Sequence, residues 1–327
     1  MPSDPSKTHV LASVHKSHKN FCLIPEISPQ YIHEKPWLIV KSLKTPEYLL
    51  TEGDKFKLGK VKLKVKEISG FRQSDNKKNL LHSKFLHNGG AAYSKKVYLP
   101  QKHCTKSLTD SNVSCRICLS DDFSDSNPLI SPCHCSGTMG MTHFECLKKW
   151  LSSKITNITY KNIQVYSWKS LHCELCSFKY PNKMMVNSSE VDLVSIHKPL
   201  TSYLVLQTGK KDSKLLHVVG LDDKKVLKFG RSHDCDLRFA DISVSRNHAN
   251  IRIKASGLFL EDLKSKFGTV VRLQKNLAID PDCSFKLQTG RTVLKFSLQT
   301  PWSFLACLNV CSRGKDAEED LHPQFVF

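Results

Sequence analysis

Hydrophobic and polar residues alternate through residues 36–70, most regularly in the stretch GKVKLKVKEI. A period of two is the pattern of a β-strand with one buried face and one solvent face. One row of this strand is apolar up to a final glutamate, and the other row consists of lysines: Val61, Leu63, Val65 and Glu67 against Lys60, Lys62, Lys64 and Lys66. The pattern therefore predicts a half-buried strand with a lysine-covered outer face.

Residues 201–300 carry many short apolar runs, separated by turn residues at intervals of about ten. This spacing predicts an all-β sandwich or barrel. The stretch FKLGKVKLKVKEI at 56–68 resembles FKLQTGRTVLKFSL at 285–298, which is expected to be the final hairpin of that sandwich. The earlier copy is therefore a piece of a second sandwich, a hairpin packed on the first one, or a generic amphipathic hairpin.

The remaining segments lack a regular pattern. Residues 1–35 are rich in Ser, Pro, His and Lys, a composition that predicts disorder. Cysteines and histidines gather in residues 113–182. The expected linkers are residues 71–112 and 183–200, and residues 301–327 form a tail. The chain is thus expected to be multidomain and mainly β, with a small cysteine-rich α+β module at its centre.

The cysteines indicate a reducing compartment. The chain has 13 cysteines, an odd number, and seven of them lie between Cys115 and Cys176. A secreted disulfide scaffold would be short and would follow a signal peptide, whereas this N-terminus is polar. No run of eighteen apolar residues occurs, so no membrane span is expected. These observations predict a cytoplasmic or nuclear protein.

The charge is strongly positive and uneven. The net charge is +19, and residues 1–114 carry +11 of it. Such an excess attracts polyanions, so nucleic acid is an admissible partner. However, the lysines are dispersed or alternate along strands and few aromatic residues accompany them, which favours a solvated basic face.

Eight soft metal ligands follow a regular spacing in the cysteine-rich segment: C-x2-C, C-x-C, H-x2-C and C-x2-C. Structural zinc is tetrahedral and prefers thiolate and imidazole, so eight ligands make two structural Zn²⁺ sites. An alternating arrangement of the four pairs would staple a segment with little core at two points. The predicted zinc site 1 is Cys115, Cys118, His143 and Cys146, and the predicted zinc site 2 is Cys133, Cys135, Cys173 and Cys176. His134 and His172 break the pairing and are left out.

The ligand order fits two families, the plant homeodomain finger and the RING-CH variant of the RING finger. The single residue between Cys133 and Cys135, the long gap before the last pair, and the stretch HFECLKKW followed by CELC resemble RING-CH sequences. A plant homeodomain finger would carry tryptophan where this chain has Leu171. The resemblance implies a cross-brace, two-zinc RING-CH fold.

Proteins that this segment resembles bind a ubiquitin-conjugating enzyme and promote ubiquitin transfer without a nucleophile of their own, by positioning the loaded enzyme. The motif implies that Ile117 and Trp150 form the apolar docking surface, although Trp150 also fits the core of the helix FECLKKWLSSK. Glu174 follows the seventh ligand, as is usual in the variant. Ser177 stands where a basic residue commonly follows the last ligand.

The stretch from KFGRSHDCDLRF to KSKFGTVV resembles a forkhead-associated (FHA) domain, a β-sandwich that binds phosphothreonine peptides. A guanidinium gives two charge-assisted bonds to a phosphate, a hydroxyl gives one more, and loop glycines allow close approach. The resemblance assigns phosphopeptide binding to Arg231, Ser245, Arg246 and Lys266, and structural roles to Gly230, His248 and Gly268. Phe267 departs from the pattern, because asparagine usually stands there and holds the peptide backbone.

Together the parts predict a RING-CH-type E3 ubiquitin-protein ligase, with a ubiquitin-conjugating enzyme and a phosphorylated protein as partners. A flexible connection would raise the local concentration of the bound substrate. One alternative is a non-enzymatic adaptor that keeps the zinc for folding and the sandwich for binding. Another is a chromatin reader with a plant homeodomain-like finger, against which Leu171 counts.

Overall fold

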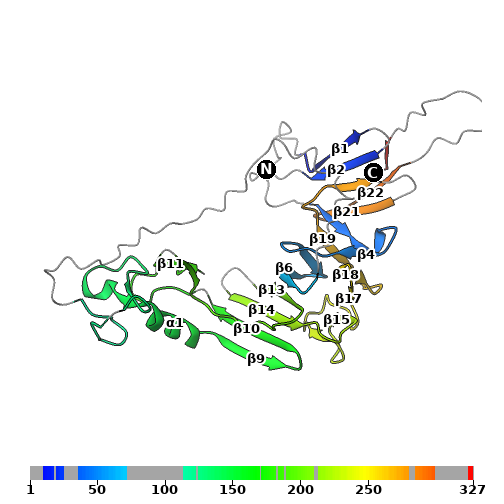
Figure 1. Ribbon diagram of the computed structural model, residues 1–327. Helices are drawn as coiled ribbons and strands as arrows, with labels where there is room; N and C mark the ends of the chain where they lie inside the picture. Colours follow the sequence, from blue (N-terminus) through cyan, green and yellow to red (C-terminus); the bar gives the residue numbers. More distant parts are fainter. Residues whose placement is uncertain are drawn as a thin grey trace, which may run out of the picture. The chain divides into compact units, whose positions relative to one another are not determined.

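The computed structural model describes residues 10–17, 20–25, 36–71, 113–122, 124–169, 171–181, 183–187, 189–209, 213–279, 284–298 and 323–326. The chain divides into two compact units (Figure 1). Unit 1 combines Met1–Ile68 with Asp223–Phe327, and unit 2 is Ser69–Asp222. Nearly all of the predicted linker over 71–112 lies outside the described residues.

One sheet of unit 1 runs in the order β16-β15-β17-β18-β4. Its strands alternate inward apolar side chains with outward polar ones, as in the β15 pattern around the fully buried Leu227 and Phe229. Four strands come from the C-terminal half and one comes from the N-terminal segment: β15 (Val226–Gly230), β16 (Leu237–Arg238), β17 (Ala249–Lys254), β18 (Gly257–Asp262) and β4 (Glu47–Leu49). In Figure 1 the blue β4 accordingly lies beside the later strand β18.

The second sheet of unit 1 has the order β23-β22-β21-β3-β19-β5-β6. Within this sheet, β19 pairs antiparallel with β3 on one side and with β5 on the other. Leu63 and Val65 are buried, as the alternating pattern predicts, and Val61 is partly buried. The strands are β3 (Trp37–Ile39), β5 (Lys55–Leu58), β6 (Val61–Ser69), β19 (Thr269–Arg272), β21 (Ser284–Thr289), β22 (Thr292–Leu298) and β23 (Pro323–Val326). A 3-10 turn, Val40–Ser42, follows β3.

The two similar hairpins therefore occupy different places in one sandwich. The β5–β6 hairpin pairs with β19 through Thr269 and Leu58, and the β21–β22 hairpin pairs with β3 through Leu287 and Leu38. Of the three alternatives for residues 36–70, the structure thus has the hairpin that is packed on the first sandwich. The reason is non-local, because the two hairpins offer the same alternation of side chains, and only the strand that each one meets in the folded sheet, β19 or β3, distinguishes their places.

The structure differs from the prediction at both ends of the chain. Within the segment predicted to be disordered, β1 (Ala12–Ser17) and β2 (Asn20–Pro25) form a hairpin that pairs with β20 (Leu277–Ile279). Phe21 and Leu23 are buried in one cluster with Leu38 and Phe285. Burying each such side chain stabilises the fold by about 1.5–3 kcal/mol. This stabilisation orders the hairpin, although the composition of the segment predicts disorder. Within the predicted tail, β23 pairs with β22.

Unit 2 begins with the cysteine-rich module. A short hairpin of β7 (Leu129–Ile130) and β8 (Thr142–His143) leads into α1 (Phe144–Ser153), and a 3-10 turn, Gly137–Gly140, lies between the two strands. Phe144, Leu147 and Leu151 lie on one face of α1 and are buried. A hairpin of β11 (Lys183–Val186) and β12 (Ser189–Asp192) follows. Met184 and Val186 of β11, and Leu193 directly after β12, belong to the same core. The first part of the predicted 183–200 linker is therefore structured, because its alternate side chains complete the core of the zinc module.

A second sheet in unit 2 runs in the order β13-β14-β10-β9. The strands are β9 (Thr156–Tyr160), β10 (Ile163–Lys169), β13 (Tyr203–Thr208) and β14 (Ser213–Gly220). Tyr166 and Trp168 of β10 pack against Val205 and Val218. Residues 201–220, predicted to be part of the sandwich, are thus paired with strands that directly follow α1. Among the residues that the structure describes, no helix has the length and apolar character needed to cross a bilayer.

Candidate functional site

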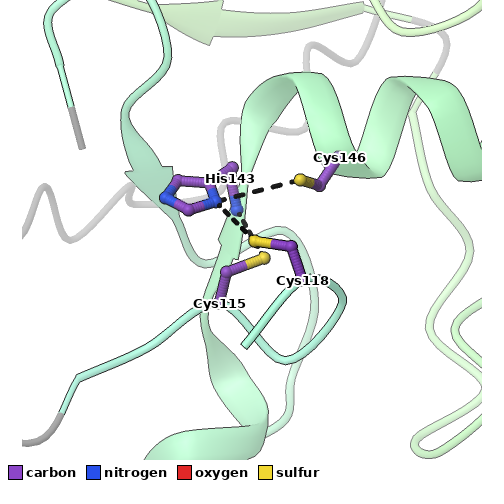
Figure 2. Close-up of side chains that lie close together, drawn as sticks. All are labelled: Cys115, Cys118, His143 and Cys146. Atoms are coloured by element: carbon purple, nitrogen blue, oxygen red, sulfur yellow. Dashed lines mark hydrogen bonds between the residues drawn. The ribbon is translucent and has the colours of Figure 1, made fainter. Parts of the chain in front are cut away.

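The predicted ligands of zinc site 1 converge on one point (Figure 2). Cys115 and Cys118 lie on a tight knuckle, which is closed by the bond from the Leu119 N–H to the Cys115 carbonyl at 2.7 Å. His143 ends β8, and Cys146 lies in the first turn of α1. The His143 Nδ1 atom is 3.3 Å from the Cys118 Sγ and 3.8 Å from the Cys146 Sγ. The four donor atoms all lie within 4.8 Å of one another.

The other ring nitrogen of His143 fixes the orientation of the imidazole. The Nε2–H donates a hydrogen bond to the backbone carbonyl of Asp122. This bond leaves the lone pair on Nδ1, directed at the thiols, which is the arrangement found for metal-ligating histidines. The imidazole is therefore held in the tautomer that zinc requires.

Zinc site 2 repeats the knuckle geometry with four cysteines. The Ser177 N–H donates to the Cys173 carbonyl at 2.9 Å, as Leu119 does to Cys115 in site 1. The Cys135 and Cys173 Sγ atoms are 3.7 Å apart, and all four Sγ atoms lie within 4.8 Å. His134 and His172 are exposed and are not members of either group, and His134 instead packs on the ring of Phe178.

Both groups fit tetrahedral zinc. Zinc–sulfur bonds of about 2.3 Å put the sulfur atoms of a tetrahedral site about 3.8 Å apart, close to the separations above. Each group offers four soft donors, as structural zinc prefers. Because all four positions are filled by protein, neither site keeps a place for a reactive water, so the metal would stabilise the fold rather than carry out hydrolysis.

The knuckles also prepare two thiols for a metal. Burial raises the pKa of the Cys115 thiol. Hydrogen bonds from the backbone N–H groups of Cys118, His143 and Ile117 together outweigh this effect and bring the pKa down to about 6. Burial likewise raises the pKa of Cys173, and the backbone N–H groups of Cys176 and Leu175 bring it down to about 5. Each knuckle thus stabilises a thiolate at its first ligand, which is the form that binds zinc.

Arg116 connects the two sites and was missed by the sequence analysis. It lies on the knuckle of zinc site 1, but its guanidinium points into site 2, where it is 3.6 Å from the Sγ atoms of both Cys135 and Cys173. It also donates to the Met139 carbonyl at 2.8 Å and to the Tyr180 hydroxyl at 3.1 Å. Four thiolates and one Zn²⁺ leave a double negative charge, which this guanidinium partly offsets.

Substituting Arg116→Gln is expected to weaken zinc binding at site 2 about 10- to 100-fold, the usual effect of removing a group that supports metal ligands. The measurement is competition with a chromophoric chelator, which reports the release of each zinc ion. Lys149→Gln is the matched control, since it removes the same charge from an exposed position on α1. Equal release from the two variants would contradict the role given to Arg116.

A small apolar groove spans the two knuckles. It has a volume of about 200 Å³ and is lined by Arg116, Ile117, Met139, Trp150, Glu174 and Leu175. Ile117, Met139 and Leu175 expose 39%, 48% and 58% of their surface, an unusual concentration of accessible apolar side chains. Trp150 lies half-buried between groove and core, with its ring 6.3 Å from that of Tyr180. Trp150 thus packs on the core that the helix pattern predicts and also lines the groove.

Two groove residues, Met139 and Leu175, were not found from the sequence. Leu175 occupies the same place in C-E-L-C as Ile117 does in C-R-I-C. That equivalence was an available signal, because the two knuckles have the same backbone geometry. Met139 lies in the 3-10 turn between β7 and β8, and nothing in its local sequence indicates that it reaches the groove.

The residues assigned to phosphopeptide binding lie on three loops of unit 1. Arg231 follows β15, Ser245 and Arg246 precede β17, and Lys266 lies between β18 and β19. Hydrogen bonds from backbone N–H groups join the loops. The Arg231 N–H donates to the Ser245 carbonyl at 3.0 Å, and the Lys266 N–H donates to the Ser245 hydroxyl at 3.1 Å. Arg231, Arg246 and Lys266 are exposed, and no described carboxylate forms an ion pair with them.

His248 holds these loops from inside. It is completely buried, and its Nδ1 atom accepts a hydrogen bond from the Ser245 N–H at 2.9 Å. Its Nε2–H donates to the Gly268 carbonyl at 3.2 Å. Burial lowers the pKa of His248, so the ring is neutral and can accept at one nitrogen while it donates at the other. The ring therefore connects the loop of Ser245 to the loop of Lys266.

Gly230 and Phe267 differ in how they affect this site. A Cβ atom at Gly230 would lie 2.0 Å from the Arg246 carbonyl oxygen, so only glycine permits the close approach of the two loops. Phe267 exposes 59% of its surface, with the Lys266 ammonium 5.7 Å from its ring. It presents an apolar and cationic surface where an amide would bind a peptide backbone.

Comparison with known families agrees with both predicted modules. Residues 115–176 match the RING-variant domain, and residues 227–293 match the FHA domain. The predictions of a RING-CH finger and of an FHA sandwich are therefore confirmed. The first match also favours the RING-CH assignment over the plant homeodomain finger.

The similar proteins are named as ubiquitin ligases. E3 ubiquitin-protein ligase MARCHF7 of Pongo abelii is 28% identical over 165 residues, which are 46% of this chain and 19% of the relative. Probable E3 ubiquitin-protein ligase MARCHF10 of Homo sapiens is 56% identical over 43 residues, 13% of this chain and 5% of the relative. E3 ubiquitin-protein ligase MARCHF3 of Xenopus laevis is 37% identical over 76 residues, 23% of this chain and 24% of the relative. The chain thus spans less than a third of the length of these relatives.

Proposed function

We propose that this protein is an E3 ubiquitin ligase of the RING-CH type. The observation that carries the proposal is the apolar groove across the two zinc knuckles, with Ile117 and Leu175 at equivalent positions on its two sides. A conjugating enzyme needs an exposed apolar surface on a rigid support, and both knuckles are held by metal ligands. The similarity to proteins named as E3 ubiquitin-protein ligases supports the same activity.

In this proposal the zinc module acts by positioning. The two groups of four ligands would each hold a zinc ion, which would supply structural stability to the knuckles. The groove binds the conjugating enzyme, and the exposed Glu174, which lines the groove and is paired with Lys154 at 3.1 Å, adds a charged contact for that enzyme. In this proposal the thioester stays on the conjugating enzyme, and transfer to a lysine occurs without a covalent intermediate on this chain.

The test is the discharge of ubiquitin from a panel of loaded conjugating enzymes by the full chain. Ile117→Ala and Leu175→Ala are each expected to slow discharge by about 10- to 30-fold, the effect of removing a central contact of an interface. Leu119→Ala is the matched control, because Leu119 lies on the same knuckle and is 78% exposed but does not line the groove. No acceleration across the panel with both zinc ions bound would favour the adaptor instead.

We further propose that the FHA sandwich recruits a phosphothreonine-containing partner. Three exposed basic side chains, which form no ion pair with a described carboxylate, and one serine hydroxyl lie at one end of the sandwich, an arrangement that suits a phosphate. The Ser245 hydroxyl accepts from the Lys266 N–H, so its own proton is available to a phosphate oxygen. Phe267 would contact an apolar part of the peptide in place of the usual amide.

A further inference from the structure

The turn between β5 and β6 lies directly against the loops of the proposed phosphopeptide site. The Gly59 N–H donates to the Gly268 carbonyl at 3.3 Å, and the Lys60 N–H donates to the Ser243 hydroxyl at 2.8 Å. Both acceptors are more than 180 residues away in the sequence. The N-terminal segment thus reaches the site through its backbone, although the matched FHA region begins only at residue 227.

Each of these two hydrogen bonds is accepted by a residue that lies on the same loop as a residue assigned to phosphate binding. Gly268 is two residues after Lys266, and its carbonyl also accepts from the buried His248, which holds the Ser245 N–H. Ser243 is two residues before Ser245 and is itself 3% exposed, with its hydroxyl 2.6 Å from the Asp241 carboxylate. The turn therefore contacts both loops that meet at Ser245.

Gly59 is required there for two separate reasons. Its φ angle of +57° lies in the left-handed region, and a Cβ atom would come within 2.4 Å of the Ser243 carbonyl oxygen. Gly290 occupies the turn of the similar hairpin β21–β22 and has nearly the same φ angle of +56°, but a Cβ atom there would meet nothing within 4 Å. The two glycines share the conformational demand, and only Gly59 has the close contact with the pocket loops.

We propose that the Gly59–Lys60 turn is a positioning element of the phosphopeptide site, so that the binding module consists of the FHA region together with residues 37–69. The turn fixes the loops that carry Ser245 and Lys266 before the ligand arrives. A ligand then meets ordered donors and does not have to order the loops itself. This inference rests on the proposed phosphothreonine binding, which it extends to the N-terminal segment.

The experiment measures binding of the full chain to an immobilised peptide pool with a fixed central phosphothreonine and randomised flanks, compared with the same pool carrying threonine. Gly59→Ala is expected to weaken phosphopeptide binding about ten-fold or more while leaving the weak binding of the unphosphorylated pool unchanged. Gly290→Ala should bind within about two-fold of the wild type, because it carries the same backbone strain without the contact. Equal loss in both variants, or none in Gly59→Ala, would overturn the proposal.

Amide hydrogen exchange separates this inference from the proposed function. If the wild type shows no preference for phosphothreonine, the proposed phosphopeptide binding fails. The rates of amide hydrogen exchange at Ser245 and Lys266 then test whether the Gly59–Lys60 turn positions these loops. Faster exchange in Gly59→Ala but not in Gly290→Ala supports the positioning role, and identical exchange overturns it. If Gly59→Ala does not fold, Ser243→Ala replaces it, because it removes the hydroxyl that accepts from Lys60 and is expected to show the same pattern.

Discussion

Cys133→Ser is expected to abolish the cooperative unfolding transition of the zinc module and to leave the chain with at most one bound zinc. Cys133 is buried in the same core as Leu147 and Leu151, and it belongs to the group that joins the loop after β7 to the knuckle at Cys173. A structural zinc contributes about 10–16 kcal/mol to folding in zinc-finger peptides at neutral pH. This is comparable to the total stability of a small domain, so loss of the site is expected to remove the fold.

The measurements are zinc content by native mass spectrometry and thermal unfolding followed by circular dichroism. Cys235→Ser is the matched control, because Cys235 is equally buried but belongs to neither ligand group. That variant should keep both zinc ions and the unfolding transition of unit 2. Retention of two zinc ions and of cooperative unfolding in Cys133→Ser would rule out the ligand set.

Arg231→Ala should remove most of the preference of the protein for phosphorylated over unphosphorylated peptide. The exposed guanidinium can give a phosphate two parallel charge-assisted hydrogen bonds, and such bonds contribute about 1.5–3 kcal/mol each. The expected loss is therefore at least about ten-fold in affinity for the phosphothreonine pool, with little change for the unphosphorylated pool. Arg231→Lys should recover only part of it, since an ammonium group cannot form the bidentate pair.

Arg252→Ala controls for the change in net charge. Arg252 is also exposed, but it lies within strand β17 and is bound to Glu261 at 2.6 Å. Binding of the phosphorylated pool by this variant should match the wild type at equal ionic strength. A preference that survives Arg231→Ala would show that phosphate is bound elsewhere on the protein.

In the proposed function the two modules are linked by recruitment of the substrate and share no reacting group. The proposed groove and the proposed phosphopeptide site belong to different units, so each can be removed by substitution without touching the other. Ile117→Ala should leave phosphopeptide binding intact, and Arg231→Ala should leave ubiquitin discharge from the free conjugating enzyme intact. Only the modification of a phosphorylated substrate needs both.

The ligand pairs of both zinc sites and the helix that carries Cys146 were predictable from the sequence, and the resemblance to FHA domains placed Arg231 and Ser245 on loops. These features depend on spacing within a few residues and on the chemistry of single side chains. Two ligands at x2 spacing close on one metal wherever the knuckle lies in the fold. The buried stripe of α1 likewise follows from its own periodicity.

Which distant segments meet could not be predicted from local patterns. The hairpins at 56–68 and 285–298 have the same alternation, and nothing in either stretch says which one pairs with β19. The partner of a strand edge is set by the summed burial of the whole sandwich, to which each local pattern contributes only an apolar face. For the same reason Leu175 joins Ile117 in one groove, Arg116 reaches Cys173, and Gly59 reaches Gly268 only once the chain has folded.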